Sequence, residues 1–275
     1  MPDPLTARRL NRAHWDSLAG LHGQGADDYY DVDALVAGAD SLSEHESAGV
    51  REAVGAVAGL DVVHLQCHIG FDTISLARRG ARVVGVDFSR ASLEKAREIA
   101  RRCGQDIEFV DADTTALGPE LHGRFDLAYA TMGVLCWIDD VAAWMSSAAA
   151  ALRPGGRLLL VDLHPLSMML DSVDPLVLDF PYADEGGRVY DEDGSYAAPD
   201  ASVGATETVQ FAHSLGEVVN AAIGAGLRIE RLDEHLDSDF DPRGRILTQE
   251  DDGRYRLRLD GEALPVTFTL IARRP

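Results

Sequence analysis

The chain has 275 residues, of which 46% are hydrophobic and 26% charged, and its 46 acidic against 25 basic side chains give a formal net charge of −21 at pH 7. This composition is typical of a globular protein with a large core, and it excludes the disordered and fibrous classes. Because so negative a surface repels phosphate groups, we expect neither nucleic acid nor an anionic membrane as a partner.

The N-terminal part of the chain, residues 1–58, is acidic, and its pattern predicts helices. We expect it to form a lid in which Tyr30 is a candidate ligand contact, since an aromatic ring stabilises a nearby cation. The first residues are polar and no run of about 18 apolar residues occurs, so neither a signal peptide nor a membrane span is predicted. Three cysteines without CxxC spacing favour reduced thiols and a cytoplasmic protein.

Between residues 60 and 163, short apolar runs alternate with helical periodicity, which predicts βα units that build a parallel sheet. The predicted strands are 62–65, 82–86, 107–110, 125–130 and 157–162. The predicted helices are 72–79, 89–103 and 141–152. The last of these helices ends at a Pro-Gly-Gly turn, because proline cannot continue a helix and glycine tolerates positive φ.

The segment 164–212 is rich in acids, glycine, proline and aromatic residues and shows no clear periodicity. Since long segments without regular structure are uncommon in compact domains and are often binding elements, we predict a cap over the ligand edge of the sheet. A helix at 214–226, a strand at 227–232 and a final strand at 264–272 follow. The chain is therefore predicted to be an α/β protein whose main domain, 59–275, carries this cap as an insertion.

Three successive strands end in residues suited to one ligand. The first runs into the turn 66–70 and then a helix, which presents backbone N–H groups and the positive end of the helix. The second ends at Asp87, whose carboxylate can accept both hydroxyls of a ribose beyond the strand ends. The third leads to Asp113, which could bind an adenine edge. We expect these ends to meet at one crevice.

Five segments resemble the motifs of the class I S-adenosylmethionine-dependent methyltransferases. They are HLQCHIG at 64–70, GVDFS at 85–89, DAD at 111–113, FDL at 125–127 and LRPGGR at 152–157. The first looks like the acidic, glycine-rich motif of that family, of which only the last glycine is kept. Together with Asn11, Trp15 and the HSLGE segment at 213–217, it looks like a bacterial subgroup of small-molecule methyltransferases.

The resemblance implies a Rossmann-like, doubly wound sheet of seven mostly parallel strands with an antiparallel last strand. It also implies methyl transfer from S-adenosyl-L-methionine to an O, N or C atom of a small-molecule acceptor. Asp87 would bind the ribose hydroxyls, and Asp113 and Thr114 would approach the adenine. The other implied cofactor contacts, which pack on the adenine, hold the methionine part or line the methyl-transfer point, are Gln66, Cys67, His68, Gly70, Thr73, Phe88, Ser89, Ala112, Thr131 and Met132.

Two motif glycines are replaced, by Gln66 and His68. These residues are expected to adopt ordinary φ values and to keep their side chains clear of the ligand, or to contact it. The replacement leaves open a cofactor-binding but non-catalytic regulatory protein. A nicotinamide-dependent oxidoreductase is disfavoured, because it needs G-x-G-x-x-G where a pyrophosphate approaches the backbone.

Two histidines are candidate general bases for the acceptor. His164 directly follows the fifth strand, and His213 precedes the next helix at the same edge of the sheet. Each has a structural alternative, as a turn residue or a helix-end contact. Methyl transfer can also proceed by alignment alone, so no base is required.

No metal site is predicted. His64, Cys67 and His68 form a cluster, but no second pair stands at zinc spacing. The acidic loop around 184–193 lacks the spacing of a calcium-binding loop. The oligomeric state and the identity of the acceptor stay open at this point.

Overall fold

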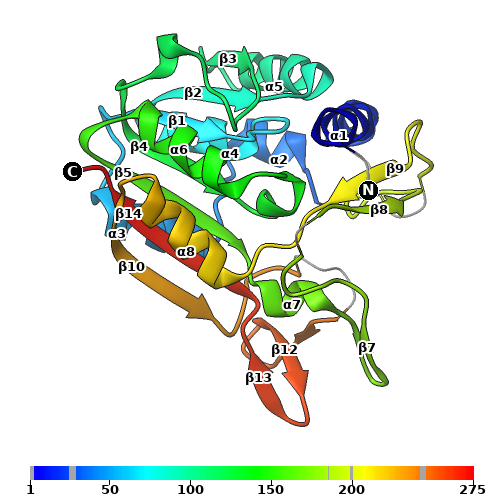
Figure 1. Cartoon of the computed structure of the whole chain (residues 1–275). Helices are drawn as coiled ribbons and strands as arrows, with labels where there is room; N and C mark the ends of the chain where they lie inside the picture. The colour runs from blue at the N-terminus through cyan, green and yellow to red at the C-terminus, as the bar shows by residue number, and fades with distance from the viewer. Residues whose placement is uncertain (1–2, 25–28, 185, 199–200, 242–245) are drawn as a thin grey trace.

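The computed structural model describes residues 3–24, 29–184, 186–198, 201–241 and 246–275. A sheet of seven strands lies at its centre (Figure 1). In chain order these strands are β1 (Asp61–Leu65), β2 (Arg82–Asp87), β3 (Glu108–Asp111), β4 (Phe125–Thr131), β5 (Leu152–Leu163), β10 (Arg228–His235) and β14 (Thr267–Arg273). Their spatial order is β10-β14-β5-β4-β1-β2-β3, and β14 runs antiparallel to both of its neighbours. The predicted Rossmann-like α/β fold is confirmed.

Helices cover both faces of the sheet. One face carries α3 (Glu44–Val54), α4 (Phe71–Arg78) and α5 (Arg90–Arg102), and the other carries α6 (Val141–Ala151) and α8 (Leu215–Gly224). Successive residues of β1 point to opposite faces, so Val62 packs on the α3 side and Val63 on the α6 side. Because both faces are buried, the strands are nearly continuous apolar runs, which is the pattern that predicted them.

The helix starts follow side-chain caps. Ser43 and Glu46 form a capping box at the start of α3, in which each side chain bonds the other residue's backbone N–H. Ser89 caps α5 and Asp140 caps α6, each by accepting a backbone N–H of the helix's first turn on its side chain. These caps set the helix starts close to the predicted positions.

The N-terminal region contains α1 (Pro4–Ala19) and α2 (Val32–Ala37) before α3. Helix α1 lies against α5 and against strand β9 (Glu207–Gln210), across the carboxyl ends of β2 and β3 (Figure 1). Helix α3 packs directly on β5 and β14, within the layer that covers the sheet. The division of the chain at residue 58 remains a prediction.

The segment 164–212 contains short elements that the sequence pattern did not predict. They are α7 (Pro165–Met169), β6 (Leu170–Val173), β7 (Leu176–Leu178), β8 (Arg188–Asp191) and β9. The strands form two hairpins, β6-β7 and β8-β9. Each strand has only three or four residues, too few for a periodic pattern to emerge.

A small sheet was also missed between β10 and β14. Its strands are β11 (Thr248–Gln249), β12 (Tyr255–Leu259) and β13 (Glu262–Leu264). The final strand was predicted from residue 264, but this residue belongs to β13 and β14 begins at Thr267. Pro265 separates the two strands, because proline has no N–H for a sheet ladder. Two 3-10 turns, η1 (Pro119–Leu121) and η2 (Leu135–Trp137), flank β4.

Candidate functional site

The turn between β1 and α4 keeps an unusual backbone. Gln66 and His68 have φ of 56° and 49°, and Gly70 has φ of 81°. The expectation of ordinary φ values at the two replaced glycines is therefore wrong, since the turn retains the left-handed conformation that glycine adopts easily. A residue with a Cβ costs about 1–2 kcal/mol in this conformation. Contacts of the two side chains offset that cost.

The Gln66 side chain points toward α6. Its amide oxygen accepts a hydrogen bond from the Trp144 indole N–H at 2.9 Å, and its amide nitrogen donates to the Val134 carbonyl at 3.1 Å. Gln66 therefore ties the turn to the loop after β4 and to the buried side of α6.

The His68 side chain points toward the N-terminal region. One ring nitrogen lies 3.1 Å from the Ser92 hydroxyl, and the other lies 2.7 Å from a ring nitrogen of His22. The Trp15 ring packs edge-on at 5.0 Å between ring centroids. Burial lowers the pKa of His68 well below its usual value and lowers the pKa of His22 to about 4. Both rings are therefore neutral near pH 7.

Asp87 lies at the end of β2 and is buried, with only 5% of its surface exposed. It accepts backbone N–H groups from His68 at 2.9 Å and Ser89 at 2.8 Å. Burial raises the pKa of Asp87 to about 6. A carboxylate has about four acceptor positions, so these two bonds leave acceptors for the hydroxyls of a ribose.

The end of β3 brings the predicted adenine contacts beside Asp87. The Ala112 N–H donates to the Asp87 carbonyl at 3.1 Å, and Thr114 is buried. One oxygen of Asp113 accepts the N–H and hydroxyl of Thr115, and the other pairs with Arg8 at 2.8 Å. The three predicted strand ends therefore lie side by side, at the edge of the sheet where the crevice was predicted.

One face of α1 contacts this crevice. This face consists of Arg8, Arg12, Trp15 and Asp16, whose successive spacings of four, three and one residues place them on one side of a helix. The Arg12 guanidinium lies 5.9 Å from the Phe88 ring centroid, and Asp16 accepts from the Ser89 hydroxyl at 2.7 Å. Sequence reasoning missed Arg8, Arg12 and Asp16. Their helical spacing marked one face of α1, but nothing in the sequence indicated what that face touches.

The end of β4 holds Thr131 and Met132. The Thr131 hydroxyl donates to the carboxyl group of Glu46, which is 4% exposed and also accepts the Ser43 N–H at 2.6 Å. Burial and the neighbouring Asp72 raise the pKa of Glu46 to about 8. Sequence reasoning also missed Glu46, because its contact with Thr131 joins residues 85 positions apart.

Two of the other predicted contacts, Thr73 and Tyr30, have side-chain partners, and a third, Cys67, is buried. Thr73 bonds a ring nitrogen of His64 at 2.8 Å. Cys67 is buried, and burial raises the pKa of its thiol well above the usual value. The Tyr30 hydroxyl lies 2.5 Å from that of Tyr196 in the cap.

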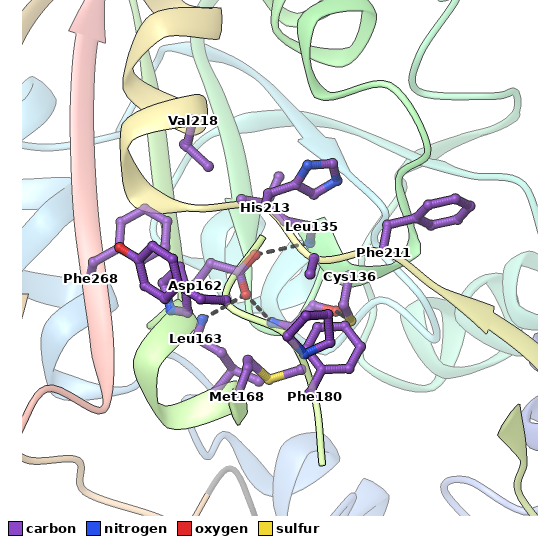
Figure 2. A pocket seen from close by; sticks show the side chains of 15 residues that line it. Leu135, Cys136, Asp162, Leu163, Met168, Phe180, Phe211, His213, Val218 and Phe268 are labelled. Carbon is purple, nitrogen blue, oxygen red and sulfur yellow. Dashed lines mark hydrogen bonds between the residues drawn. The ribbon is translucent and has the colours of Figure 1, made fainter. Parts of the chain in front are cut away.

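A cavity lies beneath the cap, next to the ends of β4 and β5 (Figure 2). Its lining is mostly apolar and comprises Gly133, Leu135, Cys136, Asp162, Leu163, Pro165, Met168, Phe180, Pro181, Tyr182, Phe211, Ala212, His213, Val218 and Phe268. Asp162 accepts backbone N–H groups from Gly133, from Leu135 at 2.9 Å and from Leu163 at 2.7 Å. These bonds leave Asp162 a structural role in shaping the cavity wall.

The two predicted histidines differ in their surroundings. The Nε2–H of His213 donates to the Ile138 carbonyl at 2.7 Å. Nδ1 lies 3.2 Å from a Glu217 oxygen, but no hydrogen bond joins them. His213 also lines the cavity. His164 instead caps α7, accepting the Leu166 N–H at 3.1 Å on Nδ1, while Nε2 contacts Glu234 at 2.8 Å.

The described residues contain no group of three or more His, Cys, Asp or Glu side chains placed to hold a metal ion. Within the same part of the chain, no helix combines the length and the apolar character needed to span a bilayer.

Residues 62–156 match a family model described as a methyltransferase domain. Among curated proteins, the ubiquinone biosynthesis O-methyltransferase of Leptothrix cholodnii is 29% identical over 124 residues, which is 44% of this chain and 52% of the relative. The enzyme of the same name from a Methylobacterium species is 35% identical over 103 residues, 36% of this chain and 39% of the relative. This chain thus spans about half the length of the first of these relatives.

Solved structures match over more of the chain. An S-adenosylmethionine-dependent methyltransferase from Mesorhizobium loti is 25% identical with a TM-score of 0.58, covering 87% of this chain and all of that one. A Burkholderia thailandensis 1,6-didemethyltoxoflavin-N1-methyltransferase, solved with bound 1,6-didemethyltoxoflavin and S-adenosylhomocysteine, has the same fold with a TM-score of 0.57 at 17% identity, covering 100% of this chain and 91% of that one. Residues 62–156 are thus similar to a methyltransferase domain, and the chain shares the fold of solved S-adenosylmethionine-dependent methyltransferases.

Proposed function

We propose that this chain transfers a methyl group from S-adenosyl-L-methionine to an O, N or C atom of a small-molecule acceptor. The observation that carries the proposal is the buried carboxylate of Asp87 with unused acceptor positions, set between the left-handed turn and the end of β3. The motif at 64–70, the lid at 1–58 and the cap at 164–212 belong to the same proposal. So does a cytoplasmic protein that acts on free small molecules rather than on nucleic acid or membranes.

The described residues fit the parts of the cofactor. Asp87 would accept the ribose hydroxyls, with Ser89 and Ala112 in the backbone around it. Phe88, Asp113 and Thr114 would surround the adenine, whereas Gln66, Cys67, His68, Gly70, Thr73 and Tyr30 would form the wall on the methionine side. When bound, the cofactor supplies an electrophilic methyl group on a positively charged sulfur. Thr131 and Met132 would lie at the point of transfer.

The cavity under the cap would hold the acceptor. Its apolar walls favour contact with an apolar part of the acceptor. His213 belongs to this lining, and its Nδ1 makes no hydrogen bond although it lies 3.2 Å from a Glu217 oxygen, so we assign it the role of general base for an acceptor O–H or N–H. His164 is expected to position the start of α7, since both of its ring nitrogens are engaged.

The proposal is tested by incubating the protein with methyl-labelled S-adenosylmethionine and a panel of small phenols, amines and carboxylic acids. We expect label in at least one acceptor and an equal amount of S-adenosylhomocysteine. Binding of the cofactor without transfer to any compound would favour the regulatory alternative. Binding of NAD instead would favour the oxidoreductase.

A further inference from the structure

Asn11, which belongs to the sequence motif but not to the proposed cofactor contacts, joins α1 to the cap. It is 1% exposed. Its amide nitrogen donates to the Val209 carbonyl at 2.8 Å, and its amide oxygen accepts the Val209 N–H at 2.7 Å. The side chain therefore bonds the edge of β9 as a neighbouring strand would. Nearby, a His14 ring nitrogen lies 2.8 Å from the Ala205 carbonyl.

Strand β9 leads from this contact into the acceptor cavity. Phe211 lies two residues beyond Val209, and its N–H donates to the Cys136 carbonyl at 2.8 Å. Phe211, Ala212 and His213 all line the cavity. A displacement of β9 at Val209 would therefore move the cavity wall that carries the proposed base.

The neighbouring face of the same helix contacts the cofactor crevice. Arg8 pairs with Asp113 at 2.8 Å, and Asp16 bonds the Ser89 hydroxyl at 2.7 Å. Helix α1 has 16 residues in one continuous run, so both sets of contacts lie on one element. Whatever fixes α1 over the cofactor also fixes the end of β9.

We propose that Asn11 is a positioning residue that couples cofactor binding to placement of the acceptor cap. The inference rests on the proposed function. Breaking the contact would leave the buried N–H and carbonyl of Val209 unpaired, which disfavours separate movement of α1 and β9. A cofactor that orders α1 therefore orders the cap as well, before or together with the acceptor.

Hydrogen exchange of the full chain, with and without saturating S-adenosylhomocysteine, tests the coupling. In the wild-type protein we expect the ligand to slow amide exchange about tenfold in both α1 and residues 207–213. In Asn11→Ala we expect protection of α1 to remain and that of 207–213 to fall to less than about twofold. Arg9→Ala, an exposed position on the same helix, is the matched control and should behave as the wild type.

Asn11→Asp keeps one acceptor for the Val209 N–H but sets its second oxygen against the Val209 carbonyl, so it should lower protection of the cap as the alanine variant does; it covers the case in which the alanine variant does not fold. A merely structural role would change exchange with and without ligand alike, so the ratio of the two rates is the readout. Equal ligand-induced protection of 207–213 in wild type and variants overturns the coupling alone. Absence of any ligand binding to the wild-type protein overturns the proposed function and the coupling with it.

Discussion

Asp87 is the side chain on which the cofactor assignment depends most directly. Its carboxylate faces two backbone N–H donors, and an asparagine would turn an NH₂ group toward such donors or toward the ribose. We expect Asp87→Asn to weaken binding of S-adenosylhomocysteine at least about tenfold. Calorimetric titration measures this, with Asp106→Asn, an exposed acid before β3, as control. Unchanged affinity in a folded Asp87→Asn variant would reject the assignment.

His213 gives a prediction about turnover. Glutamine can keep the donor to the Ile138 carbonyl but has no basic nitrogen, so His213→Gln should lower kcat about 100-fold and leave the KM for the cofactor unchanged. The comparison is His164→Gln, which should lower stability more than turnover, since His164 caps α7. Full activity of His213→Gln, with any acceptor that supports turnover, would show that alignment alone drives the reaction.

Residues at strand ends could be predicted from sequence, because a parallel sheet collects these ends at one edge. Asp87 and Asp113 were found in this way. The backbone of Gln66 and His68 was not predicted, since the hydrogen bonds that offset their left-handed φ come from residues distant in sequence, such as Trp144 and His22. Glu46 was missed for the same reason, as its contact with Thr131 spans 85 positions.

At the scale of elements, α1 covers the cofactor crevice through exposed or half-exposed ion pairs. Each such pair contributes about 0.2–1 kcal/mol to stability. In the double variant Arg8→Ala and Arg12→Ala we therefore expect both association and dissociation of S-adenosylhomocysteine to become about fivefold faster, because the helix opens more readily. Stopped-flow fluorescence follows these rates through Trp15 and Trp137, whose ring centroids lie 5.3 Å apart.

High salt should speed exchange of the ligand in the wild-type protein and have less effect in the double variant, since salt screens the same pairs. Rates that do not respond to either change would mean that α1 does not gate the crevice.

The elements themselves differ in how far they could be predicted. Long buried strands and capped helices could be predicted from the sequence. The short hairpins of the cap could not, because they depend on contacts such as that of Asn11 with β9.

At the scale of the whole molecule, buried acids make stability depend on pH. Burial and Asp72 raise the pKa of Glu46 from 4.5 to about 8, so the folded protein holds a proton that the unfolded chain has lost. Stability is therefore expected to fall as pH rises from about 6.5 to 8, by at most about 1.4 kcal/mol per pH unit for one proton. Below that window, His22 and His64 act in the opposite direction, because burial lowers their pKa values to about 4 and 3.

Glu46→Gln keeps the size of the side chain and cannot ionise; its amide oxygen can still accept the Ser43 N–H, and its amide nitrogen can donate to the Thr131 hydroxyl. Urea unfolding between pH 6.5 and 8 should show a flatter profile for this variant than for the wild type. Parallel profiles would assign the proton to another group.

The parallel strands of the central sheet followed from the alternation of strands and helices, because parallel strands need a crossover connection that is usually a helix. The small sheet β11-β12-β13 did not, since its strands contain two to five residues and are held to α3 by long-range pairs such as Arg254 with Glu44. The sequence thus predicted the part of the molecule that forms the cofactor crevice better than the parts that surround the acceptor.

Calorimetric titration of the full chain with S-adenosylhomocysteine, with NAD as parallel control, tests the central claim most directly because it needs no acceptor. We predict one site per chain with affinity near about 1 μM for S-adenosylhomocysteine and no heat with NAD. Absence of binding, or equal binding of NAD, would contradict the assignment of the crevice formed by the turn 66–70, Asp87 and Asp113.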